Sequence, residues 1–152
     1  MKHLQHSQNL PKIARQRGFT LIEIIIVVII MSMIAALVVP QLFKKVEKSK
    51  QHITKTQIIM IEDAIKMFKL SIGRYPTTQE GLKSLIEKPA NASNWDGPYL
   101  EKGIPKDPWD NEYVYLYPGK NFVFEIISYG ADGKAGGENE DKDINNWETG
   151  SK

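Results

Sequence analysis

One apolar stretch near the start of the chain constrains the fold more than any other feature. From Phe19 to Leu42 the only ionisable side chain is Glu23. As an α-helix this stretch would extend about 36 Å at 1.5 Å per residue, which exceeds the ~30 Å hydrocarbon core of a bilayer. The sequence therefore predicts a membrane-spanning helix over residues 19–42 and a small head over residues 43–152.

The residues before the apolar stretch are basic. Residues 1–18 contain no acidic side chain, and their four cationic side chains are Lys2, Lys12, Arg15 and Arg17. The whole chain has a net charge of +2, so the remaining residues sum to a net negative charge. Lys and Arg are retained on the cytoplasmic side of a membrane helix, which would place the head on the opposite side. An acidic remainder disfavours a nucleic-acid partner.

The order of these features differs from that of an ordinary secretory signal, in which a small-residue cleavage site follows the apolar region. Here the small residue, Gly18, precedes it. Cleavage between Gly18 and Phe19 would remove the basic leader, keep the helix and create an α-amino group four residues before Glu23. Intramembrane carboxylates are costly and usually functional, so the amine of one subunit could meet Glu23 of the next. The alternatives are a plain signal anchor and a Glu23 that simply reaches the interface.

Pro40 lies inside the continuing helical pattern. A proline there removes one backbone hydrogen bond and kinks or locally melts the helix. Such breaks are tolerated at membrane depth where neighbouring helices cover the freed groups, as packed helices in a filament would. The alternative is that Pro40 marks the membrane exit.

Residues 17–23 read Arg-Gly-Phe-Thr-Leu-Ile-Glu. This motif resembles the prepilin-type signal shared by type IV pilins and pseudopilins. The resemblance implies cleavage after Gly18 and N-methylation of Phe19 by a prepilin peptidase. It also implies roles for Glu23 and Pro40 in assembly, since these families commonly carry a helix-breaking proline at the position of Pro40.

Beyond the membrane segment, the pattern predicts an amphipathic stem helix over residues 43–72. Its apolar positions recur at helical spacing, and they are Ile53, Ile61, Ile65, Phe68 and Ile72. Gly73 and then Pro76 give the usual stop order. Thr77 or Thr78 can cap a short helix that has Glu80 in its first turn. In the loop that follows, Trp95 and Tyr99 are expected to anchor the chain to the core.

Residues 113–117 and 122–128 are mostly apolar and aromatic, and residues 118–121 between them favour a turn, so the pair predicts an antiparallel hairpin. The hairpin should pack against the stem. The predicted fold class is α+β and pilin-like, with a long N-terminal helix packed on a small antiparallel β-sheet head.

Three head motifs, at residues 75–82, 95–100 and 105–109, make the chain resemble the major pseudopilin of type II secretion systems. Asp110 stands where that family usually has glycine. The resemblance implies a subunit of a periplasmic filament that helps drive protein export across the outer membrane. It also implies a single-pass protein of the inner membrane with a periplasmic C-terminal domain. The implied partners are further copies, minor pseudopilins, the inner-membrane assembly platform and the prepilin peptidase.

The segment from Gly130 to Ile144 is rich in glycine and acidic residues. Its carboxylates and backbone carbonyls are the hard oxygen ligands that Ca²⁺ takes, although such a segment can also be a solvated loop. By the resemblance, residues 128–147 bind one calcium ion. Its ligands would be the side chains of Asp132, Asp141 and Asp143 and a carbonyl near Tyr129, while the resemblance leaves open whether Glu138 or Glu140 takes the place of Asp141.

The sequence offers little for catalysis, because the three histidines are His3, His6 and His52 and none lies in the head beyond the stem. We therefore expect no enzyme. Two alternative functions stay open. One is a type IV pilin-like subunit for adhesion or motility, although such pilins commonly have a C-terminal disulfide loop and this chain has no cysteine. The other is a monomeric, membrane-anchored calcium-binding module.

Overall fold

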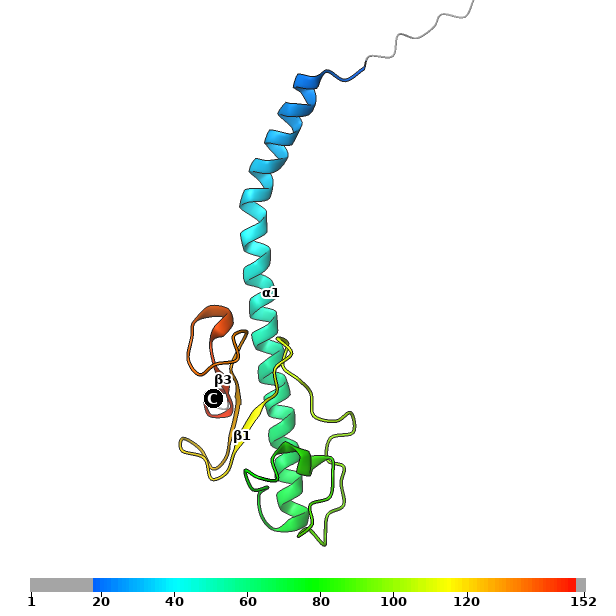
Figure 1. Ribbon diagram of the computed structural model, residues 1–152, viewed down its shortest axis with the longest axis vertical. Coiled ribbons are helices and arrows are strands. Elements are labelled where there is room, and N and C mark those ends of the chain that lie inside the picture. The colour runs from blue at the N-terminus through cyan, green and yellow to red at the C-terminus, as the bar shows by residue number, and fades with distance from the viewer. Residues whose placement is uncertain (1–17, 150–152) are drawn as a thin grey trace, which may run out of the picture. The chain divides into compact units, whose positions relative to one another are not determined.

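The computed structural model describes residues 18–149 (Figure 1). Apart from Gly18, the predicted leader lies outside the described residues. The chain divides after Pro40 into two compact units, residues 1–40 and 41–152. A single helix, α1 (Leu21–Ile72), supplies most of the described part of the first unit and the stem of the second.

Local hydrogen bonds explain both ends of α1. At the start, the backbone N–H of Glu23 donates to the Thr20 hydroxyl oxygen at 3.3 Å, an N-cap interaction. At the end, Gly73 adopts a φ of 83°, and its N–H donates to the Lys69 carbonyl at 2.8 Å. A left-handed glycine is the usual way to end a helix, so the predicted stop at Gly73 is confirmed.

Pro40 lies inside α1 without interrupting it. Because proline has no N–H, the carbonyl of Ala36 loses its helical donor. The single chain nevertheless keeps the helix through this position. Local melting at Pro40 within an assembly therefore stays a prediction.

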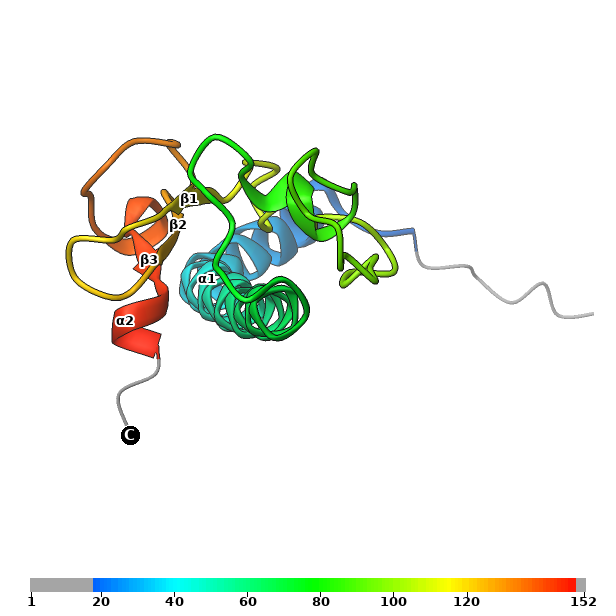
Figure 2. The same ribbon diagram turned by 90° about the horizontal axis from the view of Figure 1, so that it is seen from below.

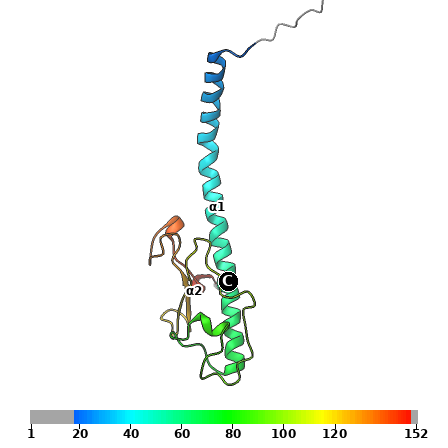
Figure 3. The same cartoon turned by 45° about the vertical axis from the view of Figure 1, so that its right-hand side comes forward.

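The head contains a three-stranded antiparallel sheet in the order β1-β2-β3, which lies alongside the second half of α1 (Figures 1 and 3). The strands are β1 (Val114–Leu116), β2 (Glu125–Ser128) and β3 (Ile144–Asn145). Tyr115 pairs with Ile126, and Ser128 pairs with Ile144. The predicted hairpin is confirmed, but its strands are shorter than predicted. The sequence prediction did not include β3 or the short helix α2 (Asn146–Thr149) that follows it.

The core forms where α1 meets the sheet. From the helix, Ile58, Ile61, Ile65 and Phe68 are fully buried. From the sheet side, their cluster includes Tyr115, Phe124 and Ile126. The predicted stripe was wrong at Ile53, which is 45% exposed. The adjacent Thr54 is buried instead, and its hydroxyl donates to the Lys50 carbonyl at 2.9 Å, so a satisfied polar group occupies this end of the buried face.

The turn after α1 is closed by a reciprocal pair of hydrogen bonds. The Glu80 N–H donates to the Thr77 hydroxyl at 3.2 Å, and the Thr77 N–H donates to the Glu80 carboxylate at 2.8 Å, which is the geometry of a capping box. The short helix η1 (Leu82–Leu85) follows, with Gly81 as its N-cap and no side-chain capping bond. The prediction that Thr77 or Thr78 caps this helix was therefore wrong, because the Thr77–Glu80 pair closes the preceding turn instead. Thr78, the other predicted cap, instead bonds through its hydroxyl to both the N–H and the carbonyl of Tyr117, tying this turn to the end of β1.

The predicted aromatic anchors are confirmed. The Trp95 indole N–H donates to the Ser84 carbonyl at 2.9 Å, and the Tyr99 ring packs edge-on against Phe68 with centroids 5.8 Å apart. Both rings lie against the core. The loop after η1 is therefore held to the head by its aromatic side chains.

The bidentate ion pair between Arg74 and Glu80 predicts a specific pH dependence of stability. Both nitrogen–oxygen distances are 2.7 Å. The Arg74 guanidinium, with the Thr77 N–H, lowers the pKa of Glu80 from 4.5 to about 2. A lowered folded-state pKa contributes stability above pH 4.5, and this contribution is lost as the pH falls towards 2. Because the pair is partly exposed, we expect Glu80→Gln to cost about 1 kcal/mol or less at pH 7.

Urea unfolding of the full chain in detergent micelles, at pH 7 and at pH 2.5, measures this contribution. The difference between wild type and Glu80→Gln should shrink at the lower pH. Glu101→Gln, which removes another exposed head carboxylate, should show little difference at either pH. A difference for Glu80→Gln that stays constant between the two pH values would contradict the assignment.

Candidate functional site

The predicted processing site lies outside regular structure. Helix α1 begins at Leu21, so the peptide bond between Gly18 and Phe19 is not part of the helix. Gly18 is exposed and Phe19 is 79% exposed. A peptidase needs an accessible, non-helical bond, and this segment offers one directly before the apolar helix.

The apolar half of α1 is exposed along its whole length. Its large hydrophobic side chains from Leu21 to Val39 are between 44% and 78% exposed. The one polar hydroxyl in its middle, that of Ser32, donates to the Val28 carbonyl at 2.7 Å, so it needs no water. By length and composition, α1 is the one helix among residues 18–149 that could cross a membrane. A continuous apolar surface of this size requires lipid or other protein to cover it.

Glu23 is the exception on this surface. Its backbone N–H donates hydrogen bonds to Thr20 at the start of the helix. Its side chain is exposed and has no hydrogen bond or ion pair among those found in the described residues. An acidic side chain in the first turn is favoured by the helix dipole. The carboxylate is therefore accessible to a cation from outside the chain.

Asp107 organises the last of the three sequence motifs. This carboxylate is 4% exposed. It accepts hydrogen bonds from the backbone N–H groups of Trp109 and Asn111 at 3.0 and 2.8 Å and from the Ser128 hydroxyl at 2.6 Å. The sequence analysis did not single it out, although an aspartate between two prolines is a typical turn acceptor. Its bonds attach the motif to β2.

Asp110 adopts a left-handed backbone conformation, with a φ of 72°. Glycine takes this conformation without steric cost, and aspartate takes it more readily than most residues. The Asp110 carboxylate forms an exposed ion pair with Lys106 at 3.0 Å. The turn is thus kept with aspartate at the position where the resemblance implies glycine.

The acidic loop is attached to this turn at its base. The Asn111 side-chain amide donates to the Gly130 carbonyl at 2.7 Å, and the Ala131 N–H donates to the Glu140 carbonyl at 2.8 Å. A Cβ atom at Gly130 would lie 2.7 Å from the Glu140 carbonyl oxygen. At Gly137 a Cβ would lie 2.5 Å from the Asp141 carbonyl oxygen. The loop therefore folds back on itself at positions that only glycine permits.

The predicted calcium ligands are not gathered into one cluster. Asp132 accepts a hydrogen bond from the Lys134 N–H, and Asp143 accepts one from the Gly136 N–H at 2.9 Å. Asp141 is half-buried in η2 (Asn139–Asp141) and Tyr129 is half-buried at the base of the loop. Within residues 18–149, no three His, Cys, Asp or Glu side chains converge on a metal position.

One atom of the loop nevertheless fits a cation. The Oδ1 atom of Asp143 is buried and has no hydrogen-bond partner. A buried carboxylate oxygen without a partner is unfavourable, and a hard oxygen of this kind is a ligand that Ca²⁺ accepts. The donor chemistry therefore fits calcium, but the complete ligand set is not preformed.

Comparison with known proteins places these features in one family. Residues 41–147 match the family described as type II secretion system protein G, and residues 13–39 match the prokaryotic N-terminal methylation motif. The core protein G of Pseudomonas aeruginosa is 45% identical over 88% of this chain and 96% of its own length. That of Vibrio cholerae is 43% identical over 90% of this chain and 94% of its own length.

A solved structure agrees with this assignment. The major pseudopilin of the type 2 secretion system of enterohaemorrhagic Escherichia coli is 33% identical, with a TM-score of 0.62, and the match covers 72% of this chain and 96% of that one. The α+β, pilin-like fold class is thus confirmed. The chain belongs to the type II secretion system protein G family, a family of structural pseudopilins rather than enzymes.

Proposed function

We propose that the mature chain, beginning at Phe19, is the repeating subunit of a pseudopilus that helps move folded proteins across the outer membrane. One observation carries the proposal. A helix with an exposed apolar surface begins within a prepilin-type motif and continues into the stem of a folded head. Such a surface can be covered by lipid in a stored subunit and by like helices in a filament.

The basic leader supports a defined orientation. Positive charges before a membrane helix stay in the cytoplasm, so the head would lie in the periplasm and α1 would cross the inner membrane once. Residues 1–18 would be removed by a prepilin peptidase at the exposed Gly18–Phe19 bond. Growth of the filament would require the assembly platform, and minor pseudopilins would accompany the repeating subunit.

Glu23 would provide an electrostatic attraction between neighbouring subunits in the filament. Its accessible carboxylate would pair with the Phe19 amine of the neighbouring subunit. An ion pair screened from water by apolar helices is much stronger than one on a protein surface. Because the two groups lie four residues apart in each copy, their pairing between copies would set the axial register of the helices.

The proposed function predicts how the chain is processed. The protein purified from membranes of its own host should begin at Phe19 and carry one added methyl group on its amine. Intact-mass spectrometry of the wild type and of Gly18→Val measures this, because a β-branched residue at the cleavage position should block processing. A wild-type species that retains Met1 to Gly18 would contradict the proposal and favour a signal-anchored monomer.

The proposed function also predicts the effect of removing the Glu23 carboxylate. Chemical crosslinking in membranes should give ladders of like subunits for the wild type, and Glu23→Ala and Glu23→Gln should both lose them because neither can offset the neighbouring amine. Glu101→Ala, which removes an exposed carboxylate from the head, should keep the ladders. Unchanged circular dichroism would show that the head still folds. Ladders that persist in both Glu23 variants would rule out this role.

We also propose that the acidic loop binds one calcium ion. The unpartnered, buried Oδ1 of Asp143 and the tight backbone turns at Gly130 and Gly137 support this. Asp132 and Asp141 would supply further side-chain oxygens, and the carbonyl of Tyr129 would help complete the shell. Since these ligands are not gathered in the single chain, the ion would also have to order the loop.

Calcium should therefore stabilise the head. At a concentration 100 times its Kd, a ligand bound only by the folded state adds about 2.7 kcal/mol, which should raise the Tm of this small head by roughly 10 °C or more. Thermal unfolding of the full chain in detergent, with and without Ca²⁺, measures the shift. Asp143→Asn should abolish the shift and Glu101→Gln should retain it. An absent wild-type shift, or an equal shift with Mg²⁺, would contradict a calcium-selective site.

A further inference from the structure

Three lysines lie on α1 directly after the apolar stretch. Lys44, Lys45 and Lys48 follow Leu42 within six residues, and all three are exposed. Among residues 18–149, no hydrogen bond or ion pair is found for their side chains. We call these three residues the stem lysines. They carry positive charge that no described residue pairs with.

The nearest acid does not neutralise the stem lysines. Glu47 is the one acidic residue between Glu23 and Glu62. Its carboxylate accepts a hydrogen bond from the Gln51 side chain at 2.9 Å. The same Gln51 nitrogen donates to the Asn139 carbonyl at 3.0 Å, which attaches this part of α1 to η2. Glu47 is therefore held by a neutral amide rather than by a lysine.

The head leaves the stem lysines uncovered. Figure 2 shows the sheet and η1 on the same side of the stem. The next lysine along the chain, Lys50, does contact the head, because its ammonium lies 5.6 Å from the centre of the Trp109 ring, a cation–π distance. Lys44 and Lys48 are four residues apart and so share one face of the helix. Lys55, seven residues further on, continues that face.

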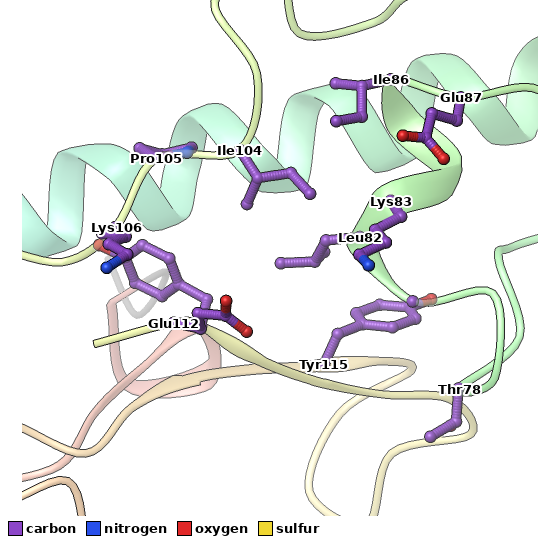
Figure 4. A pocket seen from close by; sticks show the side chains of 12 residues that line it. Thr78, Leu82, Lys83, Ile86, Glu87, Ile104, Pro105, Lys106, Glu112 and Tyr115 are labelled. Carbon is purple, nitrogen blue, oxygen red and sulfur yellow. The ribbon is translucent and has the colours of Figure 1, made fainter. Parts of the chain in front are cut away.

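The groove of the head differs from this surface, because its charges are balanced. It has a volume of about 450 Å³ and lies between η1 and residues 104–106. Lys83 and Glu87 lie at one end of it, and Lys106 and Glu112 lie at the other (Figure 4). Such a groove has no net preference for either sign of charge, whereas the stem lysines form a local excess of positive charge that attracts anions.

The place of the stem lysines along α1 corresponds to the lipid headgroups in the proposed membrane arrangement. At 1.5 Å per residue, Lys44 and Lys48 lie about 3–9 Å beyond Leu42. The headgroup layer on each side of the hydrocarbon is about 5–8 Å thick, and lysine side chains extend their ammonium groups towards it. Lys55 lies about 20 Å beyond Leu42, which is more than one Debye length of about 8 Å past the headgroups.

We propose that the stem lysines bind the phosphate groups of anionic phospholipids at the periplasmic surface of the inner membrane. Each lysine near an anionic lipid surface can raise the affinity for it by about fivefold. Interfacial lysines anchor a membrane helix, so this contact fixes the depth of the stored subunit and is broken when the subunit leaves the membrane. The inference rests on the proposed function, which places residues 19–42 in the membrane and the head in the periplasm.

The lipid selectivity of the full chain in vesicles tests the proposal. The chain is reconstituted into phosphatidylcholine vesicles that contain a trace of spin-labelled phosphatidylglycerol or of spin-labelled phosphatidylcholine. Electron paramagnetic resonance then measures the fraction of each labelled lipid that the protein immobilises. The wild type should bind phosphatidylglycerol several-fold more strongly than phosphatidylcholine, and high salt should reduce this ratio because it screens the charges.

Matched variants assign the selectivity to the stem lysines. The test variant carries Lys44→Gln, Lys45→Gln and Lys48→Gln, and its selectivity should fall several-fold. The control removes the same charge from exposed lysines farther along the chain, with Lys55→Gln, Lys102→Gln and Lys120→Gln, and it should keep the wild-type ratio. Arginine at all three stem positions should also keep it. Any contribution from residues 1–18 is equal in all variants, and unchanged circular dichroism would show that each one folds.

The remaining outcomes separate this inference from the proposed function. A wild type that stays in the vesicles after alkaline extraction but shows no selectivity would overturn the lipid contact alone. An equal loss in the test and control variants would do the same. A test variant that keeps its lipid selectivity but forms no filaments would assign the stem lysines to a neighbouring subunit, which also overturns the inference. A wild type that alkaline extraction removes from the vesicles would overturn the proposed function and the lipid contact together.

Discussion

The head depends on the burial of one face of α1. Ile58, Ile61, Ile65 and Phe68 are fully enclosed by side chains of the sheet and of the loop after η1. A head of this size has little other apolar surface to bury, and it has no disulfide because the chain has no cysteine. The helix that forms one wall of the core is also the helix whose first part exposes a long apolar surface, with Glu23 as its ionisable exception. Any event that removes the stem from the head therefore removes most of the head's core.

Buried carboxylates in the head serve structure rather than chemistry. The Asp107 carboxylate accepts hydrogen bonds from two backbone N–H groups and a hydroxyl. The Glu125 carboxylate accepts them from two backbone N–H groups and a side-chain amide. These bonds commit the two carboxylates to holding backbone turns. His52, the one histidine within residues 18–149, lies exposed on the stem, far along the chain from both. The acids that could suggest an enzyme instead fix two turns.

The sequence predicted those features of the structure that depend on neighbouring residues in the chain. It predicted less well the features that depend on contacts between distant segments. The end of α1 at Gly73, the hairpin and the aromatic anchors followed from short-range signals. The prediction that Ile53 is buried was wrong, because helical periodicity identifies one face of the helix but not the point along it where the head begins. Thr54 is buried instead, and its hydroxyl donates a hydrogen bond to a backbone carbonyl within the helix. Two-residue β3 could not be found, since it exists only by pairing with β2. At the candidate site, the motif identified the loop, but the unpartnered oxygen of Asp143 became visible only from burial.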